Sequence, residues 1–173
     1  NNIGRYDRLY GLISKYINID GKFLDIGCAT GDFLDYLYSK NIKNLSGIDP
    51  IKKYIDYAKK KAMYNVRLGM AELIPFSNKS FDVLVMDQVA EDVADIRKAI
   101  GEARRVLVDG GLFCVSVPDA SRYSKKYFFD FFWFLIREHI QHFDLAHLKL
   151  LAESEGFELV AHDRSDAPMM SEK

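Results

Sequence analysis

The residues best suited to chemistry follow a short apolar run near the start of the chain. The run 23–26 is predicted to be a buried strand, and it leads into Gly27, Gly31 and an amphipathic segment. Glycine lets a backbone turn sharply or approach a ligand closely, and the first turn of a helix offers unpaired N–H groups. The pattern therefore predicts a cofactor site. Its spacing, Asp25-x-Gly27-x-x-x-Gly31, lacks the third glycine of the dinucleotide fingerprint, which disfavours a pyrophosphate cradle.

A second acidic residue, Asp49, ends the next predicted strand, 45–49. A carboxylate about 20 residues after such a turn can accept hydrogen bonds from both hydroxyls of a ribose. NAD-binding folds place an acid similarly, so Asp49 indicates an adenosine ribose and does not identify the reaction. Pro50 and Ile51 are then predicted to offer an apolar face to the adenine. The alternative is that Asp49 only caps the helix that starts near Pro50.

Together these residues resemble motif I of the class I S-adenosylmethionine-dependent methyltransferases. The resemblance implies S-adenosylmethionine as cofactor and S-adenosylhomocysteine as product, with Asp25 meeting the cofactor's ammonium group. It also implies that the methionine part lies against the backbone of the turn, at Gly27, Cys28, Ala29 and Gly31. The alternative for Asp25 is that it only ties the turn to nearby N–H groups. The resemblance covers roughly 23–161 and is strongest for the cofactor half.

Two later segments resemble the same family. The segment 69–76 resembles its third-strand loop, where an aspartate often bonds the adenine amino group; this chain has Met70, which implies packing on the ring while the backbone at Ala71 meets the adenine edge. Glu72 is either a binding residue or a plain surface acid. Asp87 and Gln88, after the fourth predicted strand, resemble the family segment beside the methionine moiety.

The acceptor half carries weaker signals. Residues 122–143 are predicted to form a cover or insertion at the acceptor site, since the run 127–136 is densely aromatic and suits an apolar or aromatic small molecule. A core helix, a homodimer face or a membrane-surface contact are the alternatives. The family's frequent Glu-His pair is Glu91-Asp92 here, so His139 and His142 are the candidate general bases. Both could equally be structural.

These residues need a scaffold that places strand ends side by side. Apolar runs alternate with amphipathic segments along the chain, which predicts one domain, 1–173, of the α/β class: a Rossmann-like, doubly wound, mostly parallel sheet flanked by helices. The expected strands are 23–26, 45–49, 66–70, 81–86, 112–117 and 157–161, and the expected helices include 6–17, 96–107 and a last one capped by Asp144 and ended by Gly156. Residues 165–173 are a poor candidate for the family's seventh strand, so that strand is expected to be missing or the chain incomplete.

Composition narrows the class of protein. The chain has 173 residues, 49% hydrophobic and 28% charged, with a net charge of −1, which disfavours a large phosphate-binding face, so no nucleic-acid partner is expected. Its two cysteines suggest no disulfide framework and indicate a cytoplasmic setting. No stretch resembles a membrane span, no metal-ligand spacing occurs, and the lysines between 52 and 61 predict a solvated helix face.

The leading hypothesis is methyl transfer from S-adenosylmethionine to a small-molecule acceptor, at oxygen more readily than at nitrogen or carbon. A non-catalytic cofactor-binding or interaction module on the same fold is the main alternative, supported by Met70 and the doubtful seventh strand. An NAD-dependent dehydrogenase is disfavoured by the missing glycine.

Overall fold

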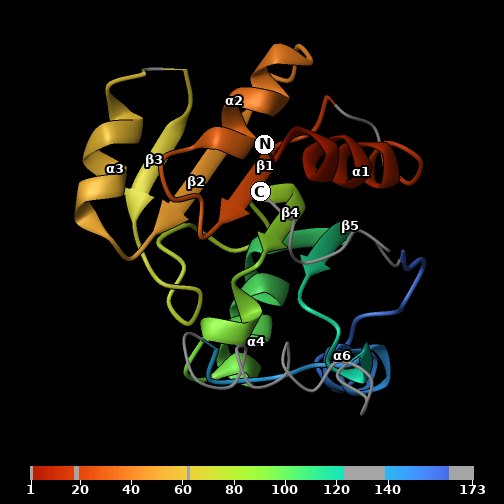
Figure 1. Ribbon diagram of the computed structural model, residues 1–173. Helices are drawn as coiled ribbons and strands as arrows, with labels where there is room; N and C mark the ends of the chain where they lie inside the picture. The colour runs from red at the N-terminus through yellow and green to blue at the C-terminus, as the bar shows by residue number, and fades with distance from the viewer. Residues whose placement is uncertain (1, 18–19, 62, 123–138, 164–173) are drawn as a thin grey trace, which may run out of the picture.

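A computed structural model describes the chain except for residues 1, 18–19, 62, 123–138 and 164–173 (Figure 1). Helices and strands alternate along it, as the sequence predicts. The strands are β1 (Phe23–Ile26), β2 (Leu45–Asp49), β3 (Asn65–Leu68), β4 (Phe81–Asp87) and β5 (Leu107–Ser116). The α-helices are α1 (Ile3–Ile13), α2 (Asp32–Ser39), α3 (Lys52–Lys59), α4 (Ile96–Val106) and α6 (Leu145–Ser154), and two short 3₁₀ turns are η1 (Ala90–Asp92) and η2 (Ala120–Arg122).

The five described strands form one parallel sheet in the order β3-β2-β1-β4-β5. The chain builds outward from β1 to β3 and then returns to the other side of β1 with β4. In such a sheet the order reverses between β1 and β4, and ligands bind outside the carboxyl ends of the strands at that point. The predicted Rossmann-like class is confirmed, and the sheet places the ends of β1, β2 and β4 at one edge.

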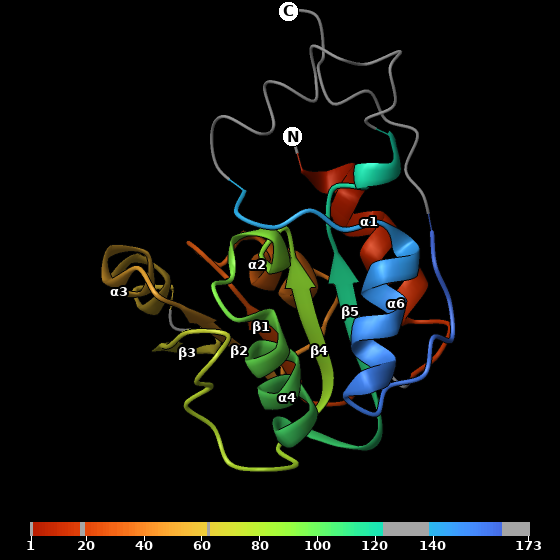
Figure 2. The same ribbon diagram turned by 90° about the horizontal axis from the view of Figure 1, so that it is seen from below.

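Helices cover both faces because neighbouring strand residues point to opposite sides. Phe23 and Val83 belong to a core shared with α1, α2 and α3, whereas Leu24 and Leu84 belong to a second core shared with α4 and partly with α6. Figure 2 shows α4 and α6 in front of the strands with α1 and α2 behind them. In the part of the chain that the structure describes, no helix is long and apolar enough to cross a membrane.

Most predicted elements are confirmed within two or three residues, including the Asp144 side chain that accepts from the His147 N–H and Gly156 with φ of 85°. The junction of α4 and β5 differs. We expected a helix to 107 and a strand from 112, but α4 ends at Val106 and Leu107 already pairs with Phe81. Gly110, with φ of 74°, therefore lies in an irregular stretch of β5 and does not end the helix.

The sixth predicted strand, 157–161, is wrong: the structure has no strand there. Phe157 packs on Phe113, with ring centroids 5.3 Å apart, while Leu159 and Val160 are largely exposed. Phe157, the first residue of this apolar run, is therefore partly buried by packing on Phe113, and residues 157–161 pair with no strand. The weak seventh-strand candidate, 165–173, lies wholly outside the described residues.

Helix α4 holds the loop that leads from β3 toward β4. Arg105 donates to the backbone oxygens of Ile74 (2.9 Å) and Phe76 (2.9 Å) and to Asn78 Oδ1 (2.9 Å). Glu102 accepts from the Ile74 N–H (2.9 Å) and from Arg105 (2.6 and 2.7 Å). This pair fixes the loop that carries the expected adenine-binding residues.

We expect Arg105→Ala to destabilise the protein, because three loop acceptors and one carboxylate lose a charged donor. The loss is about 1–3 kcal/mol in the free energy of unfolding, measured by urea denaturation. Arg104→Ala is the matched control: Arg104 is more exposed and its ion pair with Asp109 spans 3.8 Å, so about 0.5 kcal/mol or less is expected. Equal effects of the two substitutions would contradict this role for Arg105.

Candidate cofactor site

The turn after β1 is held against β2 by consecutive backbone donors. The N–H groups of Gly27 (2.8 Å) and Cys28 (2.9 Å) both donate to the oxygen of Ile48, and the next N–H, of Ala29, donates to Asp49 Oδ2 (2.9 Å). The N–H of Gly31 donates to the Cys28 oxygen (2.8 Å), which closes the turn at the start of α2. The turn thus has a fixed shape at the carboxyl edge, as the motif predicts.

Both motif glycines are needed by the fold itself. Gly27 and Gly31 have φ of 80° and 84°, which side chains other than glycine rarely adopt. A Cβ at Gly27 would overlap Val89, and one at Gly31 would overlap the hydroxyl of Tyr64. Close approach of protein segments accounts for both positions even before a ligand is considered.

The end of the turn is anchored by a polar cluster that the sequence does not reveal. Lys61 Nζ donates to the Thr30 oxygen (2.9 Å) and to Asp35, while the Tyr64 hydroxyl donates to Asp35 Oδ1 (3.0 Å). Lys61 is one of the lysines assigned to a solvated helix face, yet its side chain is only 20% exposed. The cluster supports the turn from the side of α3.

Asp49 is buried at the end of β2, and both of its oxygens accept backbone hydrogen bonds. Oδ2 accepts from Ala29 (2.9 Å) and Oδ1 from Ile51 (2.8 Å). A carboxylate has roughly four acceptor positions, so two remain for a ligand's hydroxyls. Asp49 therefore joins the turn to the start of α3. Its bond with Ile51 agrees with the capping alternative, and its two remaining acceptor positions leave the expected ribose contact open. Pro50 is exposed beside it.

Asp25, Asp49 and Asp87 bring three buried carboxyl groups to neighbouring strand ends. Burial and, to a smaller extent, the charges of Asp87 and Asp49 raise the pKa of Asp25 to about 8, while Arg5 opposes the shift. Burial also raises the pKa of Asp87, against the effects of Arg5 and of a hydrogen bond with Ser116. A site with this excess of acid favours a cationic ligand.

Two other residues predicted to bind the cofactor, Cys28 and Gln88, direct their side chains into the protein. The Cys28 thiol is buried, and a Cβ on Gly47 would stand 2.7 Å from its sulfur, so Cys28 contributes backbone and not its side chain. Gln88 has φ of 57°, its N–H donates to the Ser116 oxygen (2.8 Å), and its side-chain amide donates to the Ser116 hydroxyl (3.3 Å). Gln88 therefore fixes the end of β4 against β5.

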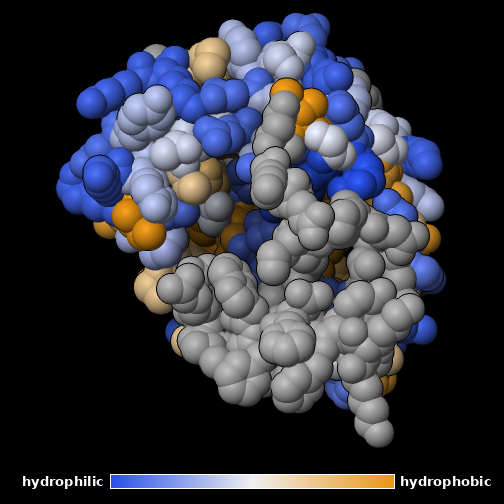
Figure 3. Space-filling model, in the orientation of Figure 1, coloured by the Kyte–Doolittle hydropathy of each residue, from blue (hydrophilic) through white to orange (hydrophobic). Residues whose placement is uncertain are grey.

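The expected adenine side is apolar and open. Ile51, Leu68, Met70 and Leu73, at the carboxyl ends of β2 and β3, are 47%, 53%, 52% and 70% exposed. Exposed apolar side chains gathered at a strand edge suit a flat ring. Ala71 is buried beside them. Elsewhere on the face in Figure 3, α2 and α3 carry mostly hydrophilic residues.

The Glu72 carboxylate binds the protein's own backbone. Its Oε1 accepts from the N–H groups of Ala94 (3.1 Å) and Asp95 (3.4 Å). These bonds tie the loop after β3 to the start of α4. The geometry favours the non-binding alternative for this residue.

An acid–histidine group lies at the end of β4, beyond the cofactor residues. His139 Nδ1 stands 2.8 Å from Asp92 Oδ1, and the N–H groups of Ile140 (3.1 Å) and Gln141 (3.0 Å) donate to the oxygen of Glu91. An imidazole therefore lies beside position 92, where the family's histidine is replaced. His142 is exposed. The predicted cover, 122–143, falls mostly on 123–138, outside the described residues.

Glu91 is a residue that the sequence prediction missed. It is 1% exposed, and neither carboxyl oxygen has a hydrogen-bond partner among the described residues. Burial raises its pKa to about 7, while His139 opposes the shift. The signal that could have identified it is its place in the Glu-His position of the resembled motif.

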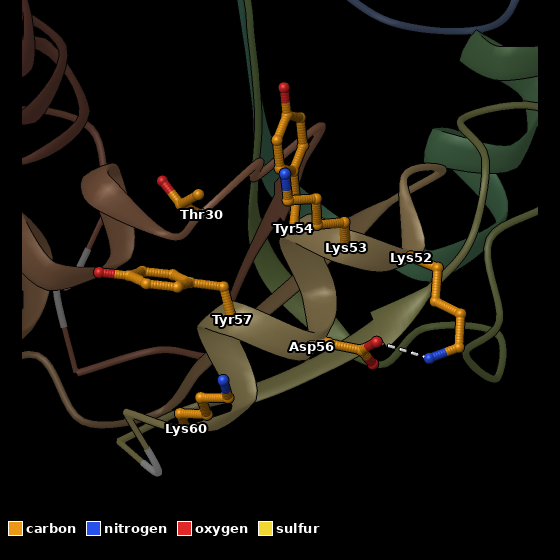
Figure 4. A pocket seen from close by; sticks show the side chains of 7 residues that line it. All are labelled: Thr30, Lys52, Lys53, Tyr54, Asp56, Tyr57 and Lys60. Carbon is orange, nitrogen blue, oxygen red and sulfur yellow. Dashed lines mark hydrogen bonds and ion pairs between the residues drawn. The ribbon is translucent and has the colours of Figure 1, made fainter.

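A cavity of about 520 Å³ lies along α3 and touches the turn at Thr30 (Figure 4). Figure 4 shows Tyr54 and Tyr57 projecting from the helix, and Lys52 Nζ lies 2.5 Å from Asp56 Oδ2. None of the three buried aspartates lines it. It is formed by the solvent-facing side of α3, so we do not assign the cofactor to it.

Comparison with known proteins identifies the class to which this geometry belongs. A family described as "Methyltransferase domain" matches residues 2–162. Uncharacterized protein MJ1252 of Methanocaldococcus jannaschii is 36% identical over 126 residues, which cover 66% of this chain and 47% of that protein. The ubiquinone/menaquinone biosynthesis C-methyltransferase UbiE of Campylobacter jejuni is 34% identical over 112 residues, covering 60% of this chain and 47% of that enzyme. The chain thus spans about half the length of these relatives.

A solved structure agrees with the sequence comparisons. The crystal structure of an S-adenosylmethionine-dependent methyltransferase of Thermotoga maritima, described as a possible histamine N-methyltransferase, aligns with a TM-score of 0.64 at 26% identity. The alignment covers 91% of this chain and 79% of the other. The strand order and the flanking helices are therefore those of this fold.

We expect Asp25→Asn to stabilise the unliganded protein at alkaline pH. Asp25 has an ordinary pKa of 3.8 when unfolded and one of about 8 when folded. Between those values the folded state holds a proton that the unfolded state has lost, so stability falls as pH rises, by up to about 1.4 kcal/mol per pH unit. The asparagine variant lacks this loss, and its melting temperature should exceed that of the wild type increasingly toward pH 8.

The control for this measurement is Asp163→Asn, which alters an exposed acid. Its melting temperature should follow the wild type at every pH. Parallel curves for the wild type and Asp25→Asn would mean that Asp25 is already ionised in the free protein.

Proposed function

Because this chain belongs to the class I S-adenosylmethionine-dependent methyltransferase family, we propose that it transfers the methyl group of S-adenosylmethionine to a small-molecule acceptor. The observation that carries the proposal is the group of buried carboxylates Asp25, Asp49 and Asp87 beside the glycine turn. A ligand that carries a sulfonium and an ammonium group favours the ionised form of these carboxyl groups and therefore suits this edge. When bound, the cofactor supplies an electrophilic methyl group, so the protein's task is to hold it and to orient the acceptor.

The residues of the edge fit the parts of this cofactor. Asp49 has two remaining acceptor positions for the ribose hydroxyls. Asp87 Oδ1 is buried without a hydrogen-bond partner among the described residues, which suits an ammonium donor close to Asp25. Ile51 and Met70 offer exposed apolar surface for the adenine. Each part of the ligand thus has a group of matching chemistry.

For the acceptor, we retain a hydroxyl oxygen of an apolar or aromatic small molecule as the prediction. Such an acceptor must lose a proton, and His139 lies with Nδ1 against Asp92. In the tautomer whose Nδ1–H donates to a carboxylate, Nε2 is the basic ring nitrogen. His139 is accordingly proposed as the general base, with Asp92 orienting it.

Transfer to carbon is the second candidate. The specific observation in its favour is the 34% identity to UbiE, whose name describes a C-methyltransferase. An activated carbon acid also releases a proton, so His139 and Asp92 would serve both acceptors. Mass spectrometry of the product distinguishes O-methyl from C-methyl by fragmentation.

The first test is direct binding. Isothermal titration calorimetry should show S-adenosylhomocysteine binding to the wild-type protein and no binding of NAD. A screen of phenolic, quinol and enol acceptors with methyl-labelled cofactor should then yield S-adenosylhomocysteine and a methylated product together. Cofactor binding without any transfer would favour the non-catalytic alternative, and absence of binding would overturn the proposal.

We expect Asp49→Asn to weaken S-adenosylhomocysteine binding by roughly tenfold or more, because a charged acceptor for the ribose hydroxyls is lost. Asp49 also holds the turn, so the ribose contact is isolated with the 2′,3′-dideoxy analogue. The wild type should lose affinity for the analogue, whereas the variant should bind both ligands about equally. A variant that discriminates as strongly as the wild type would show that Asp49 acts only on the protein.

We expect His139→Ala to lower turnover of the identified acceptor by about 10²-fold or more and to leave S-adenosylhomocysteine affinity unchanged. Asp92→Asn should give a smaller loss of the same kind, since the imidazole remains but is less well oriented. His142→Ala is the matched control, because His142 is exposed. Equal turnover in the His139 and His142 variants would remove His139 from the reaction.

A further inference from the structure

The glycine turn after β1 includes a residue in an unfavourable backbone conformation. Ala29 has φ of 44°, and the flanking glycines, Gly27 and Gly31, have φ of 80° and 84°. Glycine adopts such angles freely, whereas a residue with a Cβ adopts them at a cost in free energy. Backbone strain of this kind persists only where surrounding groups hold it in place. The groups that hold this turn therefore determine its shape before any ligand binds.

Strand β2 holds only the first half of the turn. The N–H groups of residues 27 and 28 donate to the oxygen of Ile48, and the N–H of Ala29 donates to Asp49 Oδ2 (2.9 Å). The oxygen of the next residue, Thr30, accepts from a different part of the chain. The strained residue thus lies where one set of bonds ends and another begins.

Lys61, which follows α3, supplies the bond to the second half of the turn. Its Nζ donates to the Thr30 oxygen (2.9 Å) and to Asp35 of α2, and its side chain is only 20% exposed. The Tyr64 hydroxyl donates to Asp35 Oδ1 (3.0 Å) and packs against Gly31, where a Cβ would overlap it. Asp35 and Tyr64 thereby fix the place of the ammonium group that bonds the turn.

The neighbouring lysines show that a solvated helix face does not require this arrangement. Lys59 and Lys60 are exposed. Lys61 instead gives up part of its hydration, which an ammonium group does at a cost unless charged or polar partners replace the water. Those partners are the backbone of the turn and a carboxylate of the helix that the turn begins. The arrangement therefore constrains the turn as well as the end of α3.

A turn that is already in place costs a ligand less binding free energy than one that the ligand must order. Under the proposed function, the methionine part of the cofactor lies against this turn, while the nucleoside part meets Asp49 and the apolar strand ends. Asp49 also accepts from the Ile51 N–H (2.8 Å), a bond that does not involve the turn. Loss of the Lys61 bond should therefore affect one end of the ligand more than the other.

We propose that Lys61 is a positioning residue of the cofactor site: placed by Asp35 and Tyr64, it holds the turn in the shape that receives the methionine part. This assignment rests on the proposed function and extends the site to the segment after α3. Lys61 acts through the Thr30 backbone. Its effect is therefore on the affinity for ligands that keep the amino-acid part.

The test compares S-adenosylhomocysteine with 5′-methylthioadenosine, which keeps the nucleoside and the sulfur but lacks the amino-acid part. Calorimetry gives both dissociation constants for the wild type, Lys61→Met and Tyr64→Phe. Lys61→Met should weaken S-adenosylhomocysteine binding by roughly tenfold and 5′-methylthioadenosine binding by less than about threefold. Tyr64→Phe, which removes the hydroxyl bond to Asp35, should give a smaller loss with the same selectivity, and it decides the question if Lys61→Met does not fold.

Lys60→Met is the matched control, because it removes an exposed lysine from the adjacent position. Its two dissociation constants should equal those of the wild type. A lower melting temperature of Lys61→Met with both constants unchanged would show a purely structural role and overturn the assignment, as would equal weakening of both ligands. A wild type that binds neither ligand would overturn the proposed function itself, whereas a wild type that binds both equally would overturn only the role of Lys61.

Discussion

Burial of several carboxyl groups at one edge of the sheet is the constraint on which the proposed cofactor site depends. A parallel sheet brings the ends of β1, β2 and β4 together, and in this chain those ends carry Asp25, Asp49 and Asp87. Three acids in one low-dielectric region cannot all ionise without compensation. The three acids are compensated differently. Asp49 accepts hydrogen bonds from two backbone N–H groups, Asp87 pairs with Arg5, and Asp25, with a pKa of about 8, stays protonated at neutral pH. The least compensated acid, Asp25, is the one expected to meet the ligand's positive charge, because the burial that raises its pKa also favours pairing with a bound cation.

The local pattern of the sequence is enough to predict this edge, because strand, turn and helix are consecutive in the chain. The same pattern does not explain its own glycines fully. Gly27 and Gly31 are required by Val89 and Tyr64, which lie far along the sequence and come close only in the folded protein. The two glycines thus have two explanations, the predicted cofactor turn and close packing in the folded protein, and the sequence reveals only the first. The helix limit at 107 fails for a related reason: Leu107 pairs with Phe81, and strand pairing overrides a helical stripe that continues to that residue.

The residues that sequence reasoning missed share one property: their roles are set by partners from other elements. Arg5 lies on a helix that looks only amphipathic, and Lys61 lies in a run of lysines that looks solvated. Glu91 is an ordinary acid in sequence, and its burial without a hydrogen-bond partner among the described residues becomes visible only when β4, η1 and the 139–141 segment are placed together. Charge patterns along a chain therefore identify surface faces well and identify compensated buried charges poorly.

The two halves of the site follow different rules. The cofactor half is built at strand ends, so its residues occur at fixed distances from strands that any member of the fold must have. The proposed acceptor half is not so constrained: Asp92 stands where the resembled motif often has histidine, and His139, 47 residues later in the chain, lies against it. The spacing of residues from the strand ends can therefore indicate the cofactor, while the acceptor gives no comparable pattern in the sequence. Family membership consequently constrains the reaction's donor more strongly than its acceptor.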